Sequence, residues 1–459
     1  MKNNKPPVEK NKQYTVNIES VTSEGMGVCH INGFCVFVPM TVEGDIADIL
    51  IVKVKSGYAY GKCIRLSEKS EYRREPLCPV FGKCGGCQLM HIKYEKQLEI
   101  KKEIIENALK RIGSIDLKVS KMIGADEEYR YRNKMIFPCG NDKNGNNICG
   151  FYRERSHDII PLDDCLLGDE INSKIIQTVL SFMKSFGISA YDEKSHSGVV
   201  RRIFVRKGTF SGDVMVVLSV NSNKFGHADE FVDCITSLSE KIKSVIINHN
   251  TKATNVVLGE RNTLLYGTET INDTLCTMEY EISPNSFYQI NPAQTEKLYN
   301  TAIELADIKK TDIVADLYCG IGTISLCAAA NAKSVVGIEI VEQAVINARK
   351  NAEANGVDNV SFLSGQAEKI FPRLVSDGMR PNVVILDPPR KGSDEVTLSA
   401  VAEAAPDRIV YGSCNPATLA RDAAFLRRFG YKLAAAVGVD MFPQTVHVET
   451  VCLMSRKDK

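Results

Sequence analysis

The sequence predicts an α/β protein in three parts: a small N-terminal β-barrel, a central α+β part and a C-terminal doubly wound parallel sheet. Three observations lead to this prediction. Strand-length runs separated by glycines fill the first part. The last part alternates strands with helices of about ten or more residues, which is typical of a parallel sheet. Between them, a charged helix precedes strand-like runs in no regular order. The expected boundaries are 8–68, 69–283 and 284–459.

The N-terminal part reads as a series of short strands. Tyr14–Ile18, Phe34–Val38 and Ala47–Val54 are apolar or alternate in polarity at strand length. Several short strands in a short stretch of chain predict a small closed barrel of the oligonucleotide-binding kind. The alternative is a barrel that only packs against its neighbour.

The central part contains a charged helix, expected over Tyr94–Ile112, and strand-like runs at Val199–Arg206 and Asp213–Val220. Two basic patches, the first with interleaved tyrosines, occupy 129–134 and 201–207. Aromatic rings stack on unpaired bases and Arg or Lys binds phosphate, so these patches suit single-stranded RNA. A solvated strand edge has a similar composition, so both interpretations stay open.

The C-terminal part begins with a buried strand at Ile313–Tyr318 and ends with an antiparallel pair, 431–441 and 446–454. A glycine loop follows the first strand and opens a helix, so its backbone can approach a ligand closely. Glu339 ends the next strand, where a carboxylate can bind ribose hydroxyls. Ser325 replaces the third glycine of a dinucleotide fingerprint, and a dehydrogenase remains an alternative at this point.

Cys414 ends a β-branched and aromatic strand in a Cys-Asn-Pro corner. Such a corner places the side chain at the carboxyl edge of the sheet, where open α/β sheets bind ligands. Asp387 ends another strand in an Asp-Pro-Pro corner, and Glu449 follows as a candidate base. These residues predict a thiolate nucleophile beside a cofactor, with the pKa of Cys414 lowered by polar surroundings or the adjacent helix start. A small buried cysteine is the plainer alternative.

The composition limits the partners of the chain. Its 459 residues include 57 Lys and Arg and 56 Asp and Glu, so any nucleic acid must be bound by local patches. No secretory signal and no apolar run of about eighteen residues is found, so neither export nor a membrane is expected. Fifteen cysteines, an odd number, do not fit a secreted disulfide scaffold and indicate a reducing, cytoplasmic compartment.

Four cysteines have the spacing of a metal centre. Cys78, Cys84 and Cys87 lie close together before the charged helix, and Cys165 follows much later in the chain. Three clustered thiolates with a distant fourth suit either zinc or an iron–sulfur cluster. The spacing alone does not choose between them.

The glycine loop, Glu339 and the Asp-Pro-Pro corner together resemble class I S-adenosylmethionine methyltransferases. With the motifs at 285–292, 413–416 and 447–450, nearly the whole chain resembles the RNA uracil-C5 methyltransferases. The resemblance is strongest to the branch that acts on large-subunit (23S) rRNA. It implies an N-terminal TRAM barrel, a central domain with a cysteine cluster and a Rossmann-like methyltransferase domain.

The resemblance also implies the roles of single residues. Cys414 would be the nucleophile that attacks C6 of a uridine, and Glu449 the general base. The residues that would contact S-adenosylmethionine (SAM) are Gln289, Tyr318, Glu339 and Asp387, and those that would hold a [4Fe-4S] cluster are Cys78, Cys84, Cys87 and Cys165. The expected partner is rRNA, at a single-stranded or loop uridine, with no obligatory protein partner. The alternatives are the same reaction on tRNA and a non-catalytic RNA-binding assembly factor.

Overall fold

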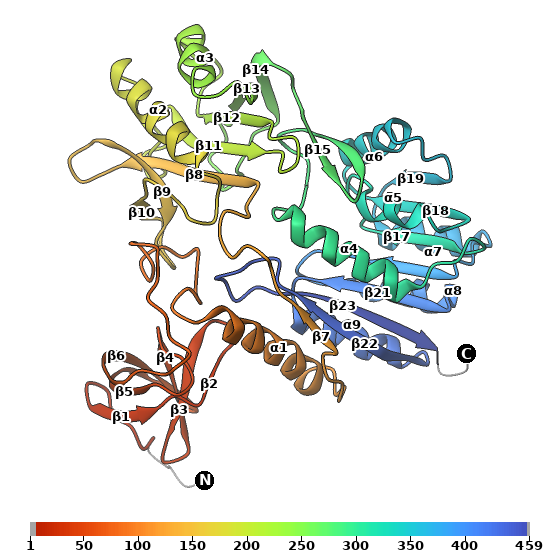
Figure 1. The fold of residues 1–459 in the computed structure, drawn as a ribbon, viewed down its shortest axis with the longest axis horizontal. Helices are drawn as coiled ribbons and strands as arrows, with labels where there is room; N and C mark the ends of the chain where they lie inside the picture. The colour runs from red at the N-terminus through yellow and green to blue at the C-terminus, as the bar shows by residue number, and fades with distance from the viewer. Residues whose placement is uncertain (1–5, 457–459) are drawn as a thin grey trace.

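Three large sheets organise the chain (Figure 1). The structure, a computed structural model, describes residues 6–456, so the last three residues of the expected 284–459 part lie outside it. Within the described range, no helix has the length and apolar character needed to cross a membrane.

The N-terminal sheet curls into a half-barrel with the strand order β1-β5-β6-β4-β3-β2. Its strands are β1 (Gln13–Asn17), β2 (Ser20–Val21), β3 (Met26–Ile31), β4 (Phe34–Pro39), β5 (Ile46–Val54) and β6 (Tyr58–Glu68). Alternate side chains point inward, as the period of two requires, and form a core that includes Val36, Val38, Ile49 and Ile51. The small N-terminal β-domain is therefore confirmed.

The central sheet has the order β10-β9-β8-β11-β12-β13-β14. Its strands are β8 (Lys134–Asn141), β9 (Asn147–Tyr152), β10 (Ile159–Pro161), β11 (Val200–Lys207), β12 (Val214–Val220), β13 (Ile242–His249) and β14 (Arg261–Gly267). Helices α2 (Ile171–Ser185) and α3 (Ala228–Thr236) pack on it through one apolar core. A hairpin of β15 (Ile271–Leu275) and β16 (Met278–Ile282) leads to the C-terminal sheet.

The C-terminal sheet has the order β19-β18-β17-β20-β21-β23-β22-β7. Its strands are β17 (Ile313–Leu317), β18 (Ser334–Glu339), β19 (Val360–Ser364), β20 (Val383–Leu386), β21 (Arg408–Ser413), β22 (Tyr431–Val439), β23 (Glu449–Arg456) and β7 (Lys121–Ile123). β17 to β21 run parallel, and β23 is antiparallel to both of its neighbours. The predicted doubly wound sheet is confirmed.

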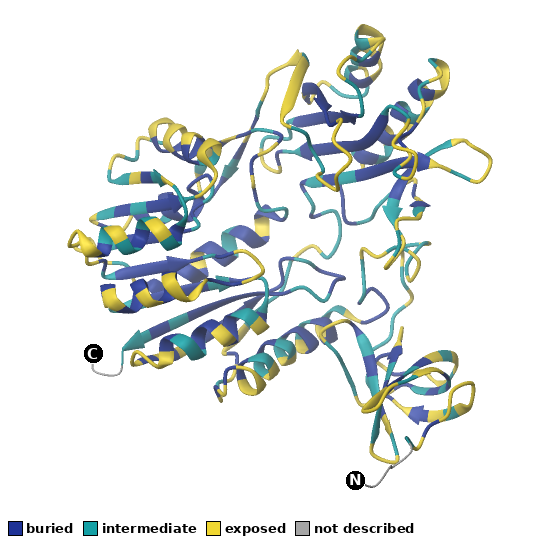
Figure 2. Ribbon diagram, turned by 180° about the vertical axis from the view of Figure 1, so that it is seen from behind, coloured by how far each residue is buried: buried dark blue, intermediate teal, exposed yellow. Residues whose placement is uncertain are grey.

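Helices cover both faces of this sheet. One apolar core joins it to α4 (Pro292–Ala306), α5 (Thr323–Ala329) and α6 (Glu342–Ala354). A second core joins the other face to α1 (Tyr94–Arg111), α7 (Ala367–Ser376), α8 (Glu395–Ala404) and α9 (Pro416–Arg427). Figure 2 shows the result: buried strands lie between helices whose outer faces are exposed.

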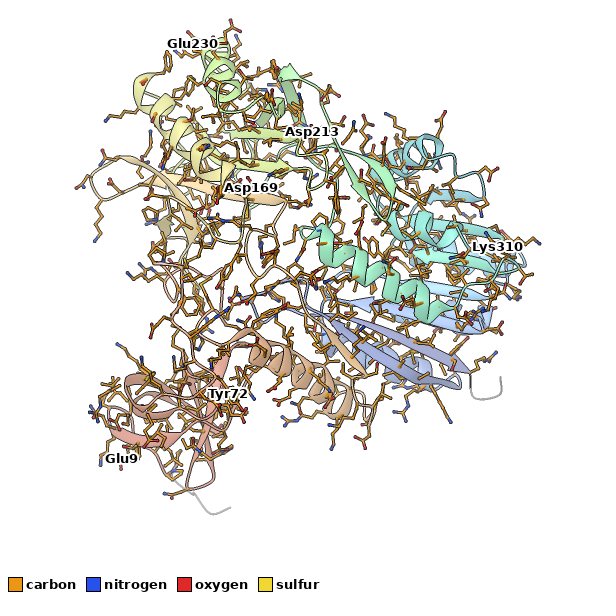
Figure 3. All side chains as sticks on the ribbon, in the orientation of Figure 1. Glu9, Tyr72, Asp169, Asp213, Glu230 and Lys310 are labelled. Atoms are coloured by element: carbon orange, nitrogen blue, oxygen red, sulfur yellow. The ribbon has the colours of Figure 1, made fainter. Side chains whose placement is uncertain are left out.

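The segment that contains α1 and β7 packs on the C-terminal sheet although it precedes the central sheet in the chain. β7 pairs in parallel with β22 at the edge of the sheet. At its other end, α1 meets the linker that follows the half-barrel, where Lys96 Nζ lies 4.6 Å from the centre of the Tyr72 ring. Figure 3 labels Tyr72 in this linker. This segment therefore links the N-terminal and C-terminal parts.

Candidate active site

The candidate site lies at the carboxyl edge of the C-terminal sheet, next to β17 and β20. The strand order reverses between these two strands, because β18 follows on one side and β21 on the other. Open α/β sheets bind ligands at such a switch point, since the loops on either side diverge and leave a crevice. Asp387 follows β20, and Cys414 lies between β21 and α9.

A pocket opens at this edge beside the glycine loop. Its lining includes three residues expected to bind a cofactor, Gln289, Tyr318 and Asp387. The other lining residues are Phe287, Tyr288, Tyr299, Asp316, Cys319, Gly320, Ile321, Thr323 and Ile324. The segment before α4 therefore forms one wall of the pocket, and the loop between β17 and α5 forms the other.

The glycine loop is held in an unusual conformation. Tyr318 has a φ of 73°, which is rare for a residue with a side chain, and its hydroxyl hydrogen-bonds to Ser393 Oγ at 2.9 Å. Gly322 has a φ of 84°, and a Cβ there would meet Phe362 at 2.8 Å, so only glycine fits. Glu339, the fourth expected cofactor residue, accepts hydrogen bonds from the amides of Gly320 and Val341. Its carboxylate is thus fixed beside the loop.

Asp316 supplies a free acceptor in the pocket. One carboxylate oxygen accepts a hydrogen bond from Ser325 Oγ, whereas the other, Oδ1, is buried without a partner. Burial and, to a smaller extent, the neighbouring carboxyl groups of Asp387 and Glu339 together raise the pKa of Asp316 to about 7, against the lowering effect of the Ser325 hydrogen bond. A buried acceptor without a donor is costly, so this pocket suits a ligand that carries a polar or cationic group.

Strand register brings Cys414 and Glu449 together. Ser413 of β21 is paired with Thr450 of β23 in an antiparallel ladder, so the next two residues, 414 and 449, follow opposite each other. The two side chains are close, because the Glu449 carboxyl raises the pKa of the Cys414 thiol. Glu449 is 5% exposed and Cys414 is half-buried. The two residues predicted to act as nucleophile and base therefore lie side by side.

The charges around Cys414 correct one expectation. Burial raises the pKa of Cys414, and the Glu449 carboxyl raises it further, although Arg390 opposes both effects. The sequence predicted a lowered pKa, because the corner suggested polar surroundings and a helix start. It did not show that two acids, Glu449 and Asp387, would face the sulfur.

Glu449 and Asp387 are also perturbed. Burial raises the pKa of Glu449 to about 8, and Asp387 adds to this rise while Arg390 opposes it. Burial raises the pKa of Asp387 to about 6. Gly412 leaves room for the Asp387 carboxyl, since a Cβ at this position would lie 3.3 Å from Oδ1. Sequence reasoning assigned no role to Arg390, although its place directly after the Asp-Pro-Pro corner was a usable signal.

The four cysteines with metal-centre spacing line a single cavity of about 250 Å³, together with Arg132. Burial and, to a smaller extent, the neighbouring thiols of Cys165 and Cys84 together raise the pKa of Cys87 to about 12, whereas Arg132 opposes this rise. In the described part of the chain, no three or more His, Cys, Asp or Glu side chains are grouped so that they could hold one metal ion. The four cysteines singled out in the sequence thus line one cavity, but the described residues there are not grouped tightly enough for a single metal ion.

The two basic patches expected to bind RNA are buried or half-buried instead. Arg206 is 1% exposed and donates to the carbonyls of Ser283 and Ser286. Tyr131 donates its hydroxyl to the Pro443 carbonyl. These side chains fasten the central sheet to the segments around the pocket. Arg206 and Tyr131 are therefore neither an exposed RNA-binding surface nor a solvated strand edge, because both are buried and bonded within the protein.

Comparison with known proteins gives the family. A family model described as tRNA (Uracil-5-)-methyltransferase matches residues 93–457, and a TRAM domain model matches residues 7–64. An uncharacterized RNA methyltransferase of Clostridium tetani is 44% identical, with 98% of this chain and 97% of that protein covered. One from Halalkalibacterium halodurans is 43% identical over both full lengths.

Among solved structures, the chain is similar to the tRNA (uracil-54, C5)-methyltransferase of Pyrococcus abyssi in complex with S-adenosyl-L-homocysteine. The TM-score is 0.76 and the identity 27%, and the match covers 96% of this chain and 100% of that one. The resemblance seen in the sequence is confirmed: the chain belongs to the tRNA (uracil-5-)-methyltransferase family of RNA-modifying enzymes and carries an N-terminal TRAM domain.

Proposed function

We propose that the protein transfers a methyl group from SAM to C5 of a uridine in large-subunit rRNA, through a temporary bond between Cys414 and C6 of the base. The rRNA target rests on the resemblance seen in the sequence. The observation that carries the covalent mechanism is the end of the β21–β23 ladder, beyond which Cys414 and Glu449 lie close enough for the carboxyl to raise the pKa of the thiol. Both residues adjoin Asp387, which also lines the pocket beside the glycine loop. A nucleophile, a base and a cofactor site thus meet at one edge of the sheet.

The chemistry requires these residue types. Uracil C5 is a weak nucleophile, so the Cys414 thiolate first forms a bond to C6 and turns the ring into an enolate. C5 then forms a bond to the electrophilic methyl group that SAM supplies on its sulfonium, and the sulfur–methyl bond breaks. Glu449 accepts the proton that remains on C5. The electron pair of the broken C5–H bond forms the C5–C6 double bond, and the bond between C6 and the Cys414 sulfur breaks to release the thiolate. The target uridine must leave its base stack to reach the pocket.

The pocket residues have matching roles in binding SAM. Glu339 is fixed at the end of β18 where it can accept the ribose hydroxyls, and the free Asp316 Oδ1 can accept from the amino group of the methionine part. Gln289, Tyr318 and Asp387 line the same pocket. Arg390 stabilises the charged forms of Cys414 and Glu449, since it lowers the pKa of both.

Two variants test this assignment in the intact protein. Cys414→Ala removes the nucleophile and is expected to abolish transfer of labelled methyl groups to RNA. Glu449→Gln leaves the thiolate but removes the base, so a covalent RNA–protein adduct should accumulate and migrate slowly on a denaturing gel. Cys234→Ala, at an exposed cysteine, is the matched control and should retain full activity. Full activity of Glu449→Gln without any adduct would remove the base assignment.

We further propose that Cys78, Cys84, Cys87 and Cys165 hold a [4Fe-4S] cluster. The four thiols line one cavity. Three clustered thiolates with a distant fourth are a ligand set that suits an iron–sulfur cluster. The Gly86 amide donates to Cys84 Sγ at 3.3 Å, and the buried Arg132 Nε has no partner, so both can offset the charge of thiolates.

Methylation of tRNA is a second candidate, because both the family model and the Pyrococcus abyssi protein are named for tRNA. That protein matches nearly this whole chain, N-terminal domain included, so the TRAM domain does not argue against tRNA. Labelled SAM should be incubated with unmodified 23S rRNA and with unmodified tRNA in parallel. Incorporation into rRNA alone supports the first candidate, and incorporation into tRNA alone supports the second.

A further inference from the structure

A groove of about 790 Å³ lies on the central sheet, away from the residues that the proposed reaction uses. It is lined by parts of β8 to β10, by the loop that follows α2, and by Arg201 and Arg202 of β11. Acidic, basic and aromatic side chains line the groove, and their contacts indicate the kind of ligand that the groove can bind.

Arg202 is a buried cation without an ion pair, although the Glu193 carboxyl lies near enough for Arg202 to lower its pKa. Its side chain is 8% exposed and donates to the Val256 carbonyl at 3.1 Å. Among the ion pairs of residues 6–456, none includes Arg202. Arg201 forms no ion pair among the described residues either, but its guanidinium is occupied by the carbonyls of Asn250, Lys252 and Thr254. A buried guanidinium without a counter-ion suits an anionic ligand, which would supply the missing charge.

The carboxylates that line the groove are engaged elsewhere. Asp142 and Asp192 each accept backbone amides within their own tight turns. Glu193 accepts from the Tyr152 hydroxyl at 2.9 Å and contacts the His157 ring nitrogen at 2.6 Å. Asp158 lies 3.9 Å from Arg153. These acids shape the loops of the groove, and none of them forms a direct ion pair with Arg202 among residues 6–456; Glu193 offsets its charge only in part.

An aromatic surface stands beside Arg202. The rings of Tyr152 and His157 are stacked, with centroids 5.0 Å apart and an interplanar angle of 28°. Glu193 holds both rings in place, as its contacts show, and the His157 side chain is 63% exposed. A rigid ring pair with one side open to solvent can stack a nucleic-acid base of any sequence.

The groove continues toward the N-terminal domain. A second hollow shares Tyr152, Arg153 and His157 with it and extends to Gly85 and Gly86, beside Cys84. Arg155, which also lines this hollow, lies 3.9 Å from Glu24 of the half-barrel. In Figure 1, β9 and β10 occupy the side of the central sheet nearest to the half-barrel. The two hollows form one track between the central sheet and the TRAM domain.

We propose that this track binds an unpaired stretch of the substrate RNA, with one phosphate on Arg202 and one base on the Tyr152–His157 pair. The proposal rests on the proposed function in taking RNA as the ligand. It adds that the enzyme grips RNA outside the catalytic pocket and requires single-stranded character there, because a duplex cannot present an unstacked base. The target uridine and the gripped stretch are then two separate points of contact.

Binding of a fluorescein-labelled single-stranded oligonucleotide to the full-length protein tests the proposal, with anisotropy measured over a range of salt concentrations. His157→Ala should weaken binding about tenfold, the effect expected for loss of one base stack. Arg202→Gln should weaken it similarly and reduce the slope of log Kd against log salt by about 0.7, the value for one phosphate of a single strand. Lys310→Gln, at the far side of the C-terminal sheet in Figure 3, is the charge-matched control and should bind normally.

Unchanged affinity in His157→Ala overturns the proposal, and this variant alters an exposed ring, so its folding is not at issue. Tighter binding of a duplex than of the single strand also overturns it. A failure of the proposed function gives another result. In that case no RNA accepts methyl groups, but His157→Ala and Arg202→Gln still bind the oligonucleotide more weakly than the parent protein. If instead methyl transfer proceeds with unchanged KM in both groove variants, the function stands and the track is wrong.

Discussion

Lys101 on α1 and Asp440 on the loop after β22 form a fully buried ion pair, with Nζ 2.5 Å from Oδ1. Burial lowers the pKa of Lys101, and the Asp440 carboxylate opposes this effect. The same ammonium also donates to the Phe442 carbonyl. The loop that leads into Glu449 is therefore fastened to a helix that lies more than three hundred residues earlier in the chain.

Replacing Asp440 by Asn should destabilise the protein strongly. The variant leaves the Lys101 ammonium buried without a counter-charge, and breaking a buried pair in this way typically costs about 3–5 kcal/mol. Urea unfolding followed by circular dichroism measures the loss. Lys118→Ala breaks an exposed pair with Glu106 on the same helix and should change the midpoint little. Equal midpoints for Asp440→Asn and the parent would show that the pair contributes nothing.

Activity should rise with pH between about 7 and 9. Glu449, with its pKa raised to about 8, is mostly protonated at pH 7 and accepts a proton only once it ionises. The pKa of Cys414 is raised as well, so the thiolate fraction grows over the same range. Arg390→Gln removes the charge that lowers both pKa values, so the rising limb of kcat/KM against pH should move to higher pH. For each pH unit by which the rising limb moves, kcat/KM at a given pH on that limb falls about tenfold.

A profile for Arg390→Gln that coincides with that of the parent enzyme would contradict this role. Lys391→Gln, one residue further along, is the control for a general loss of positive charge near the loop. It should leave the position of the limb unchanged.

Glu449→Gln should make the protein more stable in alkaline solution although it blocks turnover. The pKa of Glu449 is about 8 in the folded protein against 4.5 for a free side chain, so the folded state holds the proton more tightly. Folding stability therefore falls as pH rises from about 4.5 to 8, and glutamine removes this loss. The gain at pH 8 should be roughly 1–4 kcal/mol, and near zero at pH 4.5. Thermal unfolding at both pH values measures it, with exposed Glu342→Gln as the control.

The cysteine cavity predicts a coloured protein. Anaerobically purified enzyme should be brown, with broad absorption near about 400 nm, and should contain about four iron and four sulfide per chain. Cys87→Ala should lose both colour and iron, whereas Cys234→Ala should keep them. A colourless protein with one zinc per chain would rule out the cluster.

The parts of this structure that could be predicted are those that local patterns encode. The alternation of apolar strands and helices predicted the C-terminal sheet, and the corner at Cys414 placed that residue at its edge. The parts that could not be predicted depend on what surrounds a side chain. Arg206 looks like a phosphate ligand in the sequence, but its position on a covered strand makes it a donor to the Ser283 carbonyl. The pKa of Cys414 likewise depends on the Glu449 and Asp387 carboxyls that face it.

The pairing of β7 with β22 affects how the chain assembles on the ribosome. Lys121 leaves the ribosomal exit tunnel about three hundred residues before its pairing partner Val437 has been synthesised. At about 5–20 residues per second, the nascent strand waits for roughly 15–60 s. During this time the apolar side of α1, including Ile105 and Leu109, has no sheet to cover it. Cotranslational folding of this enzyme therefore passes through an aggregation-prone stage, and holding chaperones are expected to engage the α1 segment before synthesis ends.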